Sequence, residues 1–381
     1  MSPRESRRTE NMIYLDHAAT THPHRDVGES MQPYLETHYH NPSASYATEE
    51  TSAVANARQS VAELLGATPE RVVFTGGGSE ADNLAIKGAI DAADGEHVVT
   101  TTIEHSAVIE TCDWLEENGV DVTRVQPGED GRVDPADVED AIRPETTIVS
   151  VMHANNETGV IQPLEAIGEI TDEYDVRFHS DTVQSAGKIP IDVDDLGLDM
   201  ASLSAHKFYG PNGVGALYVR DGVELEPLIH GGGQEFGLRS GTENVAGLVG
   251  MGTAADLAVA DLEERRERLT DLRAEFVARV TGFADAKLIG HPERRLPGYA
   301  MLCFPNRTGS DLIDALAERD IAVSGGSACH SGDPSPSRVL LEMGIDPELS
   351  LGAVRFSMGR ATTENDVERV TEALREILKS A

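Results

Sequence analysis

The sequence contains few cysteines and no long apolar run. Its 381 residues include three cysteines, Cys112, Cys303 and Cys329, and no two of them form a Cys-x-x-Cys pair. An odd, low count argues against a disulfide framework or a zinc site and favours a reducing compartment. No segment approaches the roughly 20 apolar residues of a membrane span. The polar residues 1–11 lack the apolar stretch of a signal peptide. We therefore expect a cytoplasmic protein with no metal site and no membrane partner.

Basic residues are scarce compared with acidic ones. Lys and Arg total 31 against 66 Asp and Glu, which gives a formal net charge of −35. This charge argues against direct nucleic-acid binding. The acidic residues are spread along the chain rather than gathered in a tail, which fits a protein kept soluble in concentrated salt, where mutual repulsion is screened. We expect a halophilic protein; an acidic mesophilic enzyme is the alternative.

Short apolar strands alternate with amphipathic helices along the chain. This rhythm predicts an α/β fold with a mostly parallel sheet and helices on both faces, whose ligands collect at the carboxyl ends of the strands. After about Gly252 the pattern changes, and residues 254–280 predict one long charged helix followed by a smaller α/β unit. The predicted strands are 71–75, 97–100, 147–152, 177–180, 200–203 and 215–219 in the larger unit, and 300–304 and 351–357 in the smaller one.

Lys207 is one of only five lysines and lies in a loop suited to a Schiff-base cofactor. Ser204 and His206 precede it, and a Gly-Pro break follows. Such a site needs a neutral amine held at one point, with polar groups nearby for a phosphate. Asp181 lies 26 residues earlier, after a predicted strand, and a carboxylate there can keep a pyridine nitrogen protonated. Together these residues predict a site for pyridoxal 5′-phosphate (PLP).

A glycine-rich loop, Thr75–Glu80, joins a predicted strand to a predicted helix. Its small residues let backbone N–H groups approach a phosphate at the positive end of the helix. The loop lacks the lysine of a nucleotide-triphosphate loop, which argues against binding of that class of ligand. An ordinary strand-to-helix turn is the alternative.

Cys329 differs from the other two cysteines in its surroundings. Residues 324–336 are small, polar and loop-forming, so little there could bury a thiol. An exposed cysteine beside His330 suits a nucleophile with an accessible thiolate; an incidental loop cysteine is the alternative. Cys112 and Cys303 lie in an apolar helix stripe and an apolar strand, and we expect both to be structural.

Seven short motifs lie in a fixed order along the chain. They are Tyr14–Thr21, Glu104–His105, Asn155–Gly159, Asp181–Gln184, Ser204–Lys207, Arg239–Thr242 and Ser327–Cys329. In this order they resemble the cysteine desulfurases of the class V aminotransferase family, in the group with a long cysteine-bearing loop, and the resemblance covers residues 14–360. It implies a fold-type-I PLP-dependent transferase with a large domain, residues 14–255, built on a mostly parallel, seven-stranded-type sheet. A small α/β domain, residues 1–13 and 256–381, is implied to carry the cysteine loop.

The resemblance also implies a set of catalytic and cofactor-binding residues. Lys207, Cys329 and His105 are implied to be catalytic, with His105 stacked on the cofactor ring. Taken singly, His105, Asn155 and Asp181 could instead be polar residues at a strand end or in a turn. The implied cofactor-binding residues are Gly78, Ser79, His105, Asn155, Asp181, Gln184, Ser204, His206, Lys207 and Thr242.

Two further roles follow from the resemblance. Arg355 resembles the arginine that holds the substrate carboxylate, with Asn155 beside it, and a planar guanidinium suits that task. A surface arginine is the alternative reading of Arg355, and Arg360 is a nearby competitor. Thr242 resembles a residue that reaches the cofactor site of the neighbouring subunit, which implies a homodimer.

The activity implied by the resemblance is the conversion of L-cysteine to L-alanine. Sulfur passes to Cys329 as a persulfide, and then to a sulfur-acceptor protein such as an iron–sulfur scaffold or a tRNA-thiolation enzyme. A selenocysteine lyase or another class V PLP enzyme is one alternative, and it would not depend strictly on Cys329. A degenerate PLP fold that acts only as an assembly partner is another, and the presence of Lys207, Asp181 and Cys329 argues against it.

The charge and the implied dimer predict a dependence on salt. Screening shortens the range of charge repulsion from about 30 Å at 0.01 M salt to about 3 Å at 1 M. Because the net charge is −35, low salt should loosen the fold, the dimer or both. We expect the melting temperature and the dimer population to rise along a potassium chloride series, measured by thermal melts and sedimentation. Equal melting temperatures in low and molar salt would contradict the halophilic interpretation, and a monomer at all salts would contradict the dimer.

Overall fold

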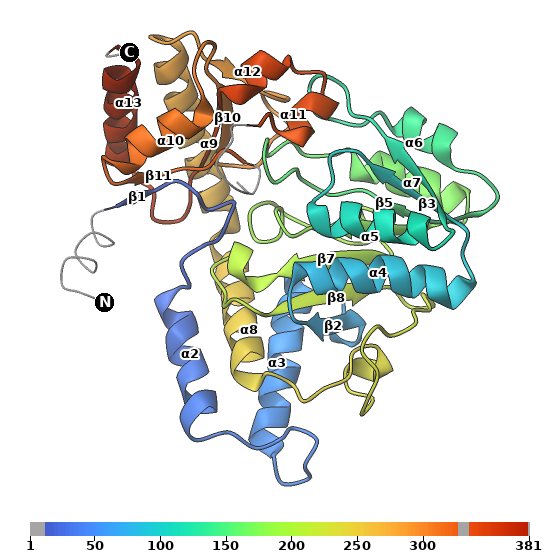
Figure 1. Ribbon diagram of the computed structural model, residues 1–381. Coiled ribbons are helices and arrows are strands. Elements are labelled where there is room, and N and C mark those ends of the chain that lie inside the picture. Colours follow the sequence, from blue (N-terminus) through green and yellow to red (C-terminus); the bar gives the residue numbers. More distant parts are fainter. Residues whose placement is uncertain (1–11, 327–334, 380–381) are drawn as a thin grey trace.

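The centre of the molecule is a seven-stranded sheet. The computed structural model describes residues 12–326 and 335–379, and Figure 1 shows the sheet packed against helices. The strands are β2 (Val72–Thr75), β3 (His97–Thr101), β4 (Asp121–Val125), β5 (Thr146–Ser150), β6 (Arg177–Asp181), β7 (Met200–Ser204) and β8 (Gly215–Val219). Their order is β2-β8-β7-β6-β5-β3-β4; β8 is antiparallel to both neighbours, and the other pairs are parallel. The predicted α/β fold with a mostly parallel sheet is confirmed.

Helices cover both faces of this sheet. They are α2 (Arg25–Glu36), α3 (Thr48–Leu64), α4 (Gly78–Ala93), α5 (Ser106–Glu117), α6 (Pro135–Ala141), α7 (Leu164–Glu173) and α8 (Val245–Ala260), with short 3-10 turns η1 (Pro69–Arg71), η2 (Ala205–Lys207) and η3 (Glu235–Gly237). Alternate strand residues point to opposite faces. Val72 and Phe74 of β2 share a core with α3, α7 and α8, whereas Val73 shares a core with α4 and α5. Because both faces are covered, most strands are apolar on both sides.

The C-terminal part forms a smaller α/β unit around a three-stranded antiparallel sheet. Its elements are β9 (Lys287–Leu288), β10 (Tyr299–Cys303), β11 (Ile321–Ala322), β12 (Ala353–Ser357), α9 (Leu262–Thr281), α10 (Gly309–Ala317), α11 (Arg338–Glu342), α12 (Pro347–Leu351) and α13 (Glu364–Lys379), joined by β1 (Ile13–Tyr14). The strand order is β12-β10-β9, and β1 pairs in parallel with β11. The core of this unit includes Leu15, and the rings of Phe276 and Phe356 lie 4.8 Å apart. The exact division of the chain into two domains stays a prediction.

One helix expected from the sequence is in fact two helices. The chain bends by 71° between α8 and α9, so the prediction of a single helix over residues 254–280 is wrong. The break lies at Asp261, whose carboxylate accepts hydrogen bonds from Arg265 and Arg360. Helix α8 is buried in the hydrophobic core on one face of the seven-stranded sheet. Helix α9 instead packs one apolar stripe against the hydrophobic core of the smaller unit. A straight helix could not reach both cores.

The helices differ in length and apolarity from a membrane-spanning helix. In residues 12–326 and 335–379, no single helix is long and apolar enough to cross a membrane, and only the bent pair of α8 and α9 together would meet that requirement.

The close contact between α3 and α8 gives a stability prediction. A Cβ at Gly252 of α8 would lie 2.7 Å from the Cα of Ala57 in α3. We expect Gly252→Ala to lower the free energy of unfolding by about 1–3 kcal/mol, because rotating a side chain cannot relieve a clash with backbone. The matched control is Gly28→Ala in α2, where a Cβ meets nothing within 4 Å; it should be neutral or stabilise by up to about 1 kcal/mol. Denaturant unfolding measures the free energy of unfolding of both variants. Equal free energies of unfolding for Gly252→Ala and Gly28→Ala would show that α3 and α8 are not in such close contact.

Candidate active site

The predicted site residues gather at the carboxyl ends of β6 and β7. A cavity of about 240 Å³ lies there. It is lined by Gly78, Ser79, Asp82, His105, Met152, Asn156, Asp181, Val183, Gln184, Ser204, His206 and Lys207. The cavity therefore brings together every predicted cofactor-binding residue except Asn155 and Thr242.

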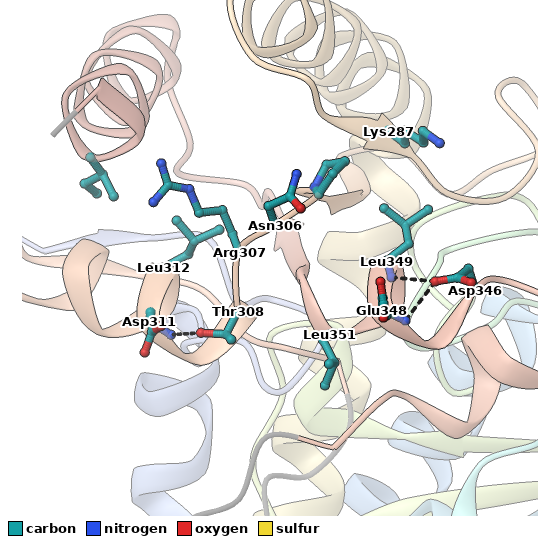
Figure 2. A pocket seen from close by; sticks show the side chains of 12 residues that line it. Lys287, Asn306, Arg307, Thr308, Asp311, Leu312, Asp346, Glu348, Leu349 and Leu351 are labelled. Carbon is teal, nitrogen blue, oxygen red and sulfur yellow. Dashed lines mark hydrogen bonds between the residues drawn. The ribbon is translucent and has the colours of Figure 1, made fainter. Parts of the chain in front are cut away.

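A larger cavity lies in the smaller unit and has different chemistry. Figure 2 shows side chains that line it, and its volume is about 740 Å³. Its lining includes Lys287 of β9, Asp311 of α10 and Glu348 of α12, but none of the predicted site residues. The volume of a cavity therefore does not identify the active site. The residues that line the cavity of about 240 Å³ do identify it.

Lys207 ends the η2 turn that follows β7. Its Nζ donates hydrogen bonds to the carbonyl oxygens of Ala18 (2.7 Å) and Ala19 (2.8 Å). Burial lowers the pKa of Lys207 to about 8, the charge of Arg355 adds to this shift, and nearby carboxylates oppose it. A minor share of the amine is therefore neutral at neutral pH, a far larger share than in an ordinary lysine, and the neutral form is the one that a Schiff base requires.

Asp181 ends β6 and is 5% exposed. Its Oδ1 accepts a hydrogen bond of 2.9 Å from the backbone N–H of Val183. Burial raises the pKa of Asp181, whereas His105 and Lys207 act in the opposite direction. A protonated ring nitrogen would give this buried carboxyl a further partner of opposite charge.

The glycine loop leads into the N-terminus of α4. Gly77 has φ +153°, a backbone conformation that other residues rarely adopt. Gly78 begins the helix, and a Cβ at this position would come within 2.7 Å of the Val183 Cγ2 atom. The unpaired N–H groups and the dipole of the first helical turn attract an anion. Ser79 and Ser204 add hydroxyl groups to the same cavity, so the loop fits a phosphate.

Two histidines flank these groups. The Nδ1 atom of His206 lies 3.0 Å from the Thr20 Oγ1 atom. Burial, with the charges of Lys207 and Lys188, lowers the pKa of His206 to about 4, so its ring is neutral at neutral pH. His105 is exposed and caps α5, where its Nδ1 accepts a hydrogen bond from the backbone. Both rings line the cavity.

Asn155 and Gln184 have well-defined partners. The Oδ1 atom of Asn155 accepts hydrogen bonds from the backbone N–H groups of Glu157 and Thr158, and its amide donates to the backbone. These contacts give Asn155 the role of a turn residue, and its contact with cofactor or substrate stays a prediction. The amide of Gln184 donates to a backbone carbonyl, and its Oε1 accepts a hydrogen bond of 2.7 Å from Tyr299.

The structure separates the two candidate arginines. Arg355 of β12 is 3% exposed and donates to the Asn156 carbonyl and the Asp16 carboxylate, each at 2.7 Å. Because Asn156 lines the cavity, Arg355 lies directly beside it. Arg360 instead donates to Asp261 at the bend between α8 and α9. The geometry favours Arg355 as the group that binds the substrate carboxylate.

Three predicted site residues, Asn155, Thr242 and Arg355, are not part of the lining of the cavity. Thr242 is exposed. Cys329 lies outside the described residues. The described cysteines, Cys112 and Cys303, are buried, and burial raises the pKa of each thiol to about 12. Neither can supply a thiolate at neutral pH.

The sequence analysis missed Asp82, Met152, Asn156 and Val183, all of which line the cavity. Asp82 lies three residues after Ser79 in α4. Residues three or four apart share one face of a helix, and this spacing could have indicated Asp82. Met152 follows β5, and Asn156 and Val183 lie inside the motifs Asn155–Gly159 and Asp181–Gln184, but no property of their side chains distinguishes them as cavity residues.

The donor set of the cavity fits PLP. Lys207 would hold its aldehyde carbon, Asp181 its ring nitrogen, and the N-terminus of α4 its phosphate. The fold and this donor set define a PLP-dependent enzyme of fold type I. Comparison with known families agrees, because residues 13–370 match the family described as Aminotransferase class-V.

Individual relatives indicate the group within this family to which the chain is most similar. The chain is 43% identical to a protein named cysteine desulfurase IscS from Dictyoglomus turgidum, over 96% of this chain and 94% of that one. It is 44% identical to the protein of the same name from Methanosarcina thermophila, over 97% and 93%. Among solved structures, a NifS-like protein matches with a TM-score of 0.91 at 37% identity, covering 97% of this chain and all of that one. The chain belongs to the class V aminotransferase family and, within it, to the cysteine desulfurases.

The lowered pKa of Lys207 predicts how the cofactor is taken up. An amine reacts in its neutral form, so the rate at which cofactor-free protein couples PLP should rise through pH about 8 and then level off. An ordinary lysine would continue to gain neutral amine up to about pH 10.4. Stopped-flow absorbance measures the rate, with Lys207→Ala as the control that forms no covalent link. Borohydride reduction should place the pyridoxyl group on Lys207; finding it on Lys188 or Lys87 would overturn the assignment.

Proposed function

We propose that the protein converts L-cysteine to L-alanine and transfers the sulfur to Cys329. The observation that carries this proposal is a partly neutral, half-buried Lys207 amine in the same cavity as the buried Asp181 carboxyl and the α4 N-terminus. One matching structure, described as SspA in complex with cysteine, has a TM-score of 0.81 at 39% identity, and the match covers 91% of this chain and 98% of that one. It supports L-cysteine as the substrate.

Lys207 would move the proton at the substrate Cα. Bound PLP withdraws electrons from that carbon when its ring nitrogen is protonated. The Ala18 and Ala19 carbonyls hold the amine at one point, and its lowered pKa keeps a share of it able to accept a proton. Asp181 would retain the proton on the ring nitrogen, and His105, exposed at the edge of the cavity, would stack on the ring.

Arg355 would bind the carboxylate of the substrate. In the described structure its guanidinium donates to the Asp16 carboxylate, whose side chain is 20% exposed. A substrate carboxylate offers the same chemistry, so it could take the place of Asp16 at one side of the guanidinium. The buried position of Arg355 and its bond to Asn156 would fix the direction from which the substrate enters.

Cys329 would take up the sulfur. Its thiolate attacks the sulfur of L-cysteine, an S–S bond forms, and the C–S bond breaks. The electron pair of the C–S bond remains on the substrate Cβ, which takes up a proton and becomes the methyl group of L-alanine, while the two sulfur atoms together lose two electrons and form the persulfide. The persulfide would then pass to an acceptor, an iron–sulfur scaffold protein or a tRNA-thiolation enzyme, in a halophilic cytoplasm.

A homodimer would complete the site. Thr242 is exposed in this chain, as expected of a residue that enters the cavity of a partner. Large apolar side chains are exposed at the end of α2, in the segment between α2 and α3, and in η3: Leu35 (69%), Tyr39 (76%), Tyr46 (74%) and Phe236 (60%). Tyr39 and Tyr46 both contact the ring of His40, and an exposed apolar patch is typical of an interaction surface, which supports a second copy of the chain as the partner.

The dependence on Cys329 tests the proposal. In molar potassium chloride, purified protein should release sulfide and alanine from L-cysteine in the presence of a thiol reductant. Cys329→Ser should keep the visible band of bound PLP and lose both products to background, because a hydroxyl cannot form a persulfide. Cys303→Ala is the matched control and should retain transfer, since its thiol is buried. Undiminished alanine formation by Cys329→Ser would favour a selenocysteine lyase instead.

A further inference from the structure

Asp82 places a second carboxyl in the cofactor cavity. It lies on α4, is 1% exposed and lines the cavity together with Asp181 and His105. One carboxylate oxygen of Asp82, one of Asp181 and a ring nitrogen of His105 lie within 4.8 Å of one another. None of the steps proposed above uses Asp82.

The polar groups around Asp82 do not neutralise a negative charge on it. Its Oδ1 has no hydrogen-bond partner among residues 12–326 and 335–379. His179 of β6 approaches to 3.7 Å, but its two ring nitrogens are already bonded to Ser150 and Ser202 at 2.9 Å. Burial lowers the pKa of His179 to about 3, so this ring is neutral and forms no ion pair.

A third buried carboxyl, that of Glu104, also disfavours a negative charge on Asp82. Glu104, which precedes His105, is 1% exposed, and its Oε1 accepts hydrogen bonds from Thr101 and from the Met152 backbone. Burial raises the pKa of Glu104 to about 8. When Glu104 is ionised, its negative charge repels a negative charge on Asp82 and so raises the pKa of Asp82 further.

The groups of the cavity that favour an ionised carboxylate act on Asp181 instead. His105 and Lys207 both favour the ionised form of Asp181. Burial first, and then the charge of Asp181, raise the pKa of Asp82 well above its ordinary value, while Ser202 opposes this in part. Two carboxyls so close in a buried site do not both ionise, and Asp181 is the one whose ionised form is favoured by Lys207 and by the Val183 N–H.

We propose that Asp82 remains a neutral carboxylic acid in the holoenzyme and donates its proton in a hydrogen bond to the Asp181 carboxylate. Asp82 is then a positioning residue. One oxygen of Asp181 is fixed by the Val183 N–H, and the donor from Asp82 adds a second restraint on the carboxylate that faces the cofactor ring. This inference rests on the proposed placement of the ring nitrogen against Asp181.

Asp82→Asn tests the charge of Asp82, because the amide keeps the shape and an N–H donor but cannot ionise. The readout is the pH at which the visible absorption of the bound cofactor changes. A neutral Asp82 predicts the same pH for the variant and the wild type. An ionised Asp82 predicts a lower pH in Asp82→Asn, since the protonated link to Lys207 would lose a nearby negative charge; that result would overturn the proposal.

Asp82→Leu tests the hydrogen bond, because it keeps the branched shape without a donor. A hydrogen bond to a charged group is worth about 10- to 100-fold in binding, so equilibrium dialysis should show a weakening of PLP binding by about that factor. Asp82→Asn should bind PLP like the wild type. Wild-type affinity in Asp82→Leu would overturn the positioning role. Absence of a visible band in all three proteins, by contrast, would contradict the proposed function.

Thermal melts of the holoenzyme provide a third readout that does not require Asp82→Leu to fold. A carboxyl whose pKa is raised by folding stabilises the protein fully below its unfolded pKa of about 3.9, and that contribution is lost as the pH rises. The wild type should therefore lose stability relative to Asp82→Asn as the pH rises above about 4. A difference in melting temperature that stays constant with pH would overturn the neutral Asp82.

Discussion

Removal of charged groups from water controls this active site. Burial is the largest cause of the pKa shifts of Lys207, Asp181 and His206, and in each case it disfavours the charged form. The cavity thus holds a partly neutral amine, a neutral imidazole and a carboxyl that needs a cation. A cofactor with a protonated ring nitrogen and a phosphate supplies the charges that this protein environment lacks.

The same cavity is also where the two units of the chain meet. The segment after β1 begins in the core of the smaller unit at Leu15, and three residues later its carbonyl groups hold Lys207. Arg355 of β12 reaches the Asn156 carbonyl from the other side. A shift of the smaller unit would therefore move both the lysine and the arginine, so packing between the units controls the geometry of the site.

Ser337 and Arg338 form hydrogen bonds with residues that neighbour the lining of the cavity. Ser337 donates a hydrogen bond of 2.5 Å to the buried Glu157 carboxyl. Arg338 donates to the carbonyl of Glu104, the neighbour of His105, at 2.7 Å. Glu157 belongs to the same motif as Asn155 and Asn156. Ser337 and Arg338 are therefore anchored to the turn that carries Asn156 and to the residue before His105.

Local pattern was sufficient to predict much of this protein. The strand Gly215–Val219 coincides with its predicted bounds, and the strand His97–Thr101 is one residue longer than predicted, because period and propensity act over a few residues. The order of strands, each followed by a polar residue or a glycine, also placed Asp181 and Lys207 at one edge of the sheet. The motifs that carry the family resemblance are short and continuous, so they too could be read from the sequence.

The remaining features depend on contacts between distant residues. The 71° bend at Asp261 arises because α8 and α9 bury their apolar surfaces in different cores. The helical pattern of the sequence on either side of the bend does not indicate which core each helix packs against. Arg355 and Arg360 lie five residues apart, and only packing decides which one reaches the cavity. The partners of Lys207 are backbone carbonyls, which any sequence could supply. Asp82 could be an ordinary exposed helix residue by its sequence, and the tertiary structure alone buries it beside Asp181, where desolvation and a neighbouring charge alter its chemistry.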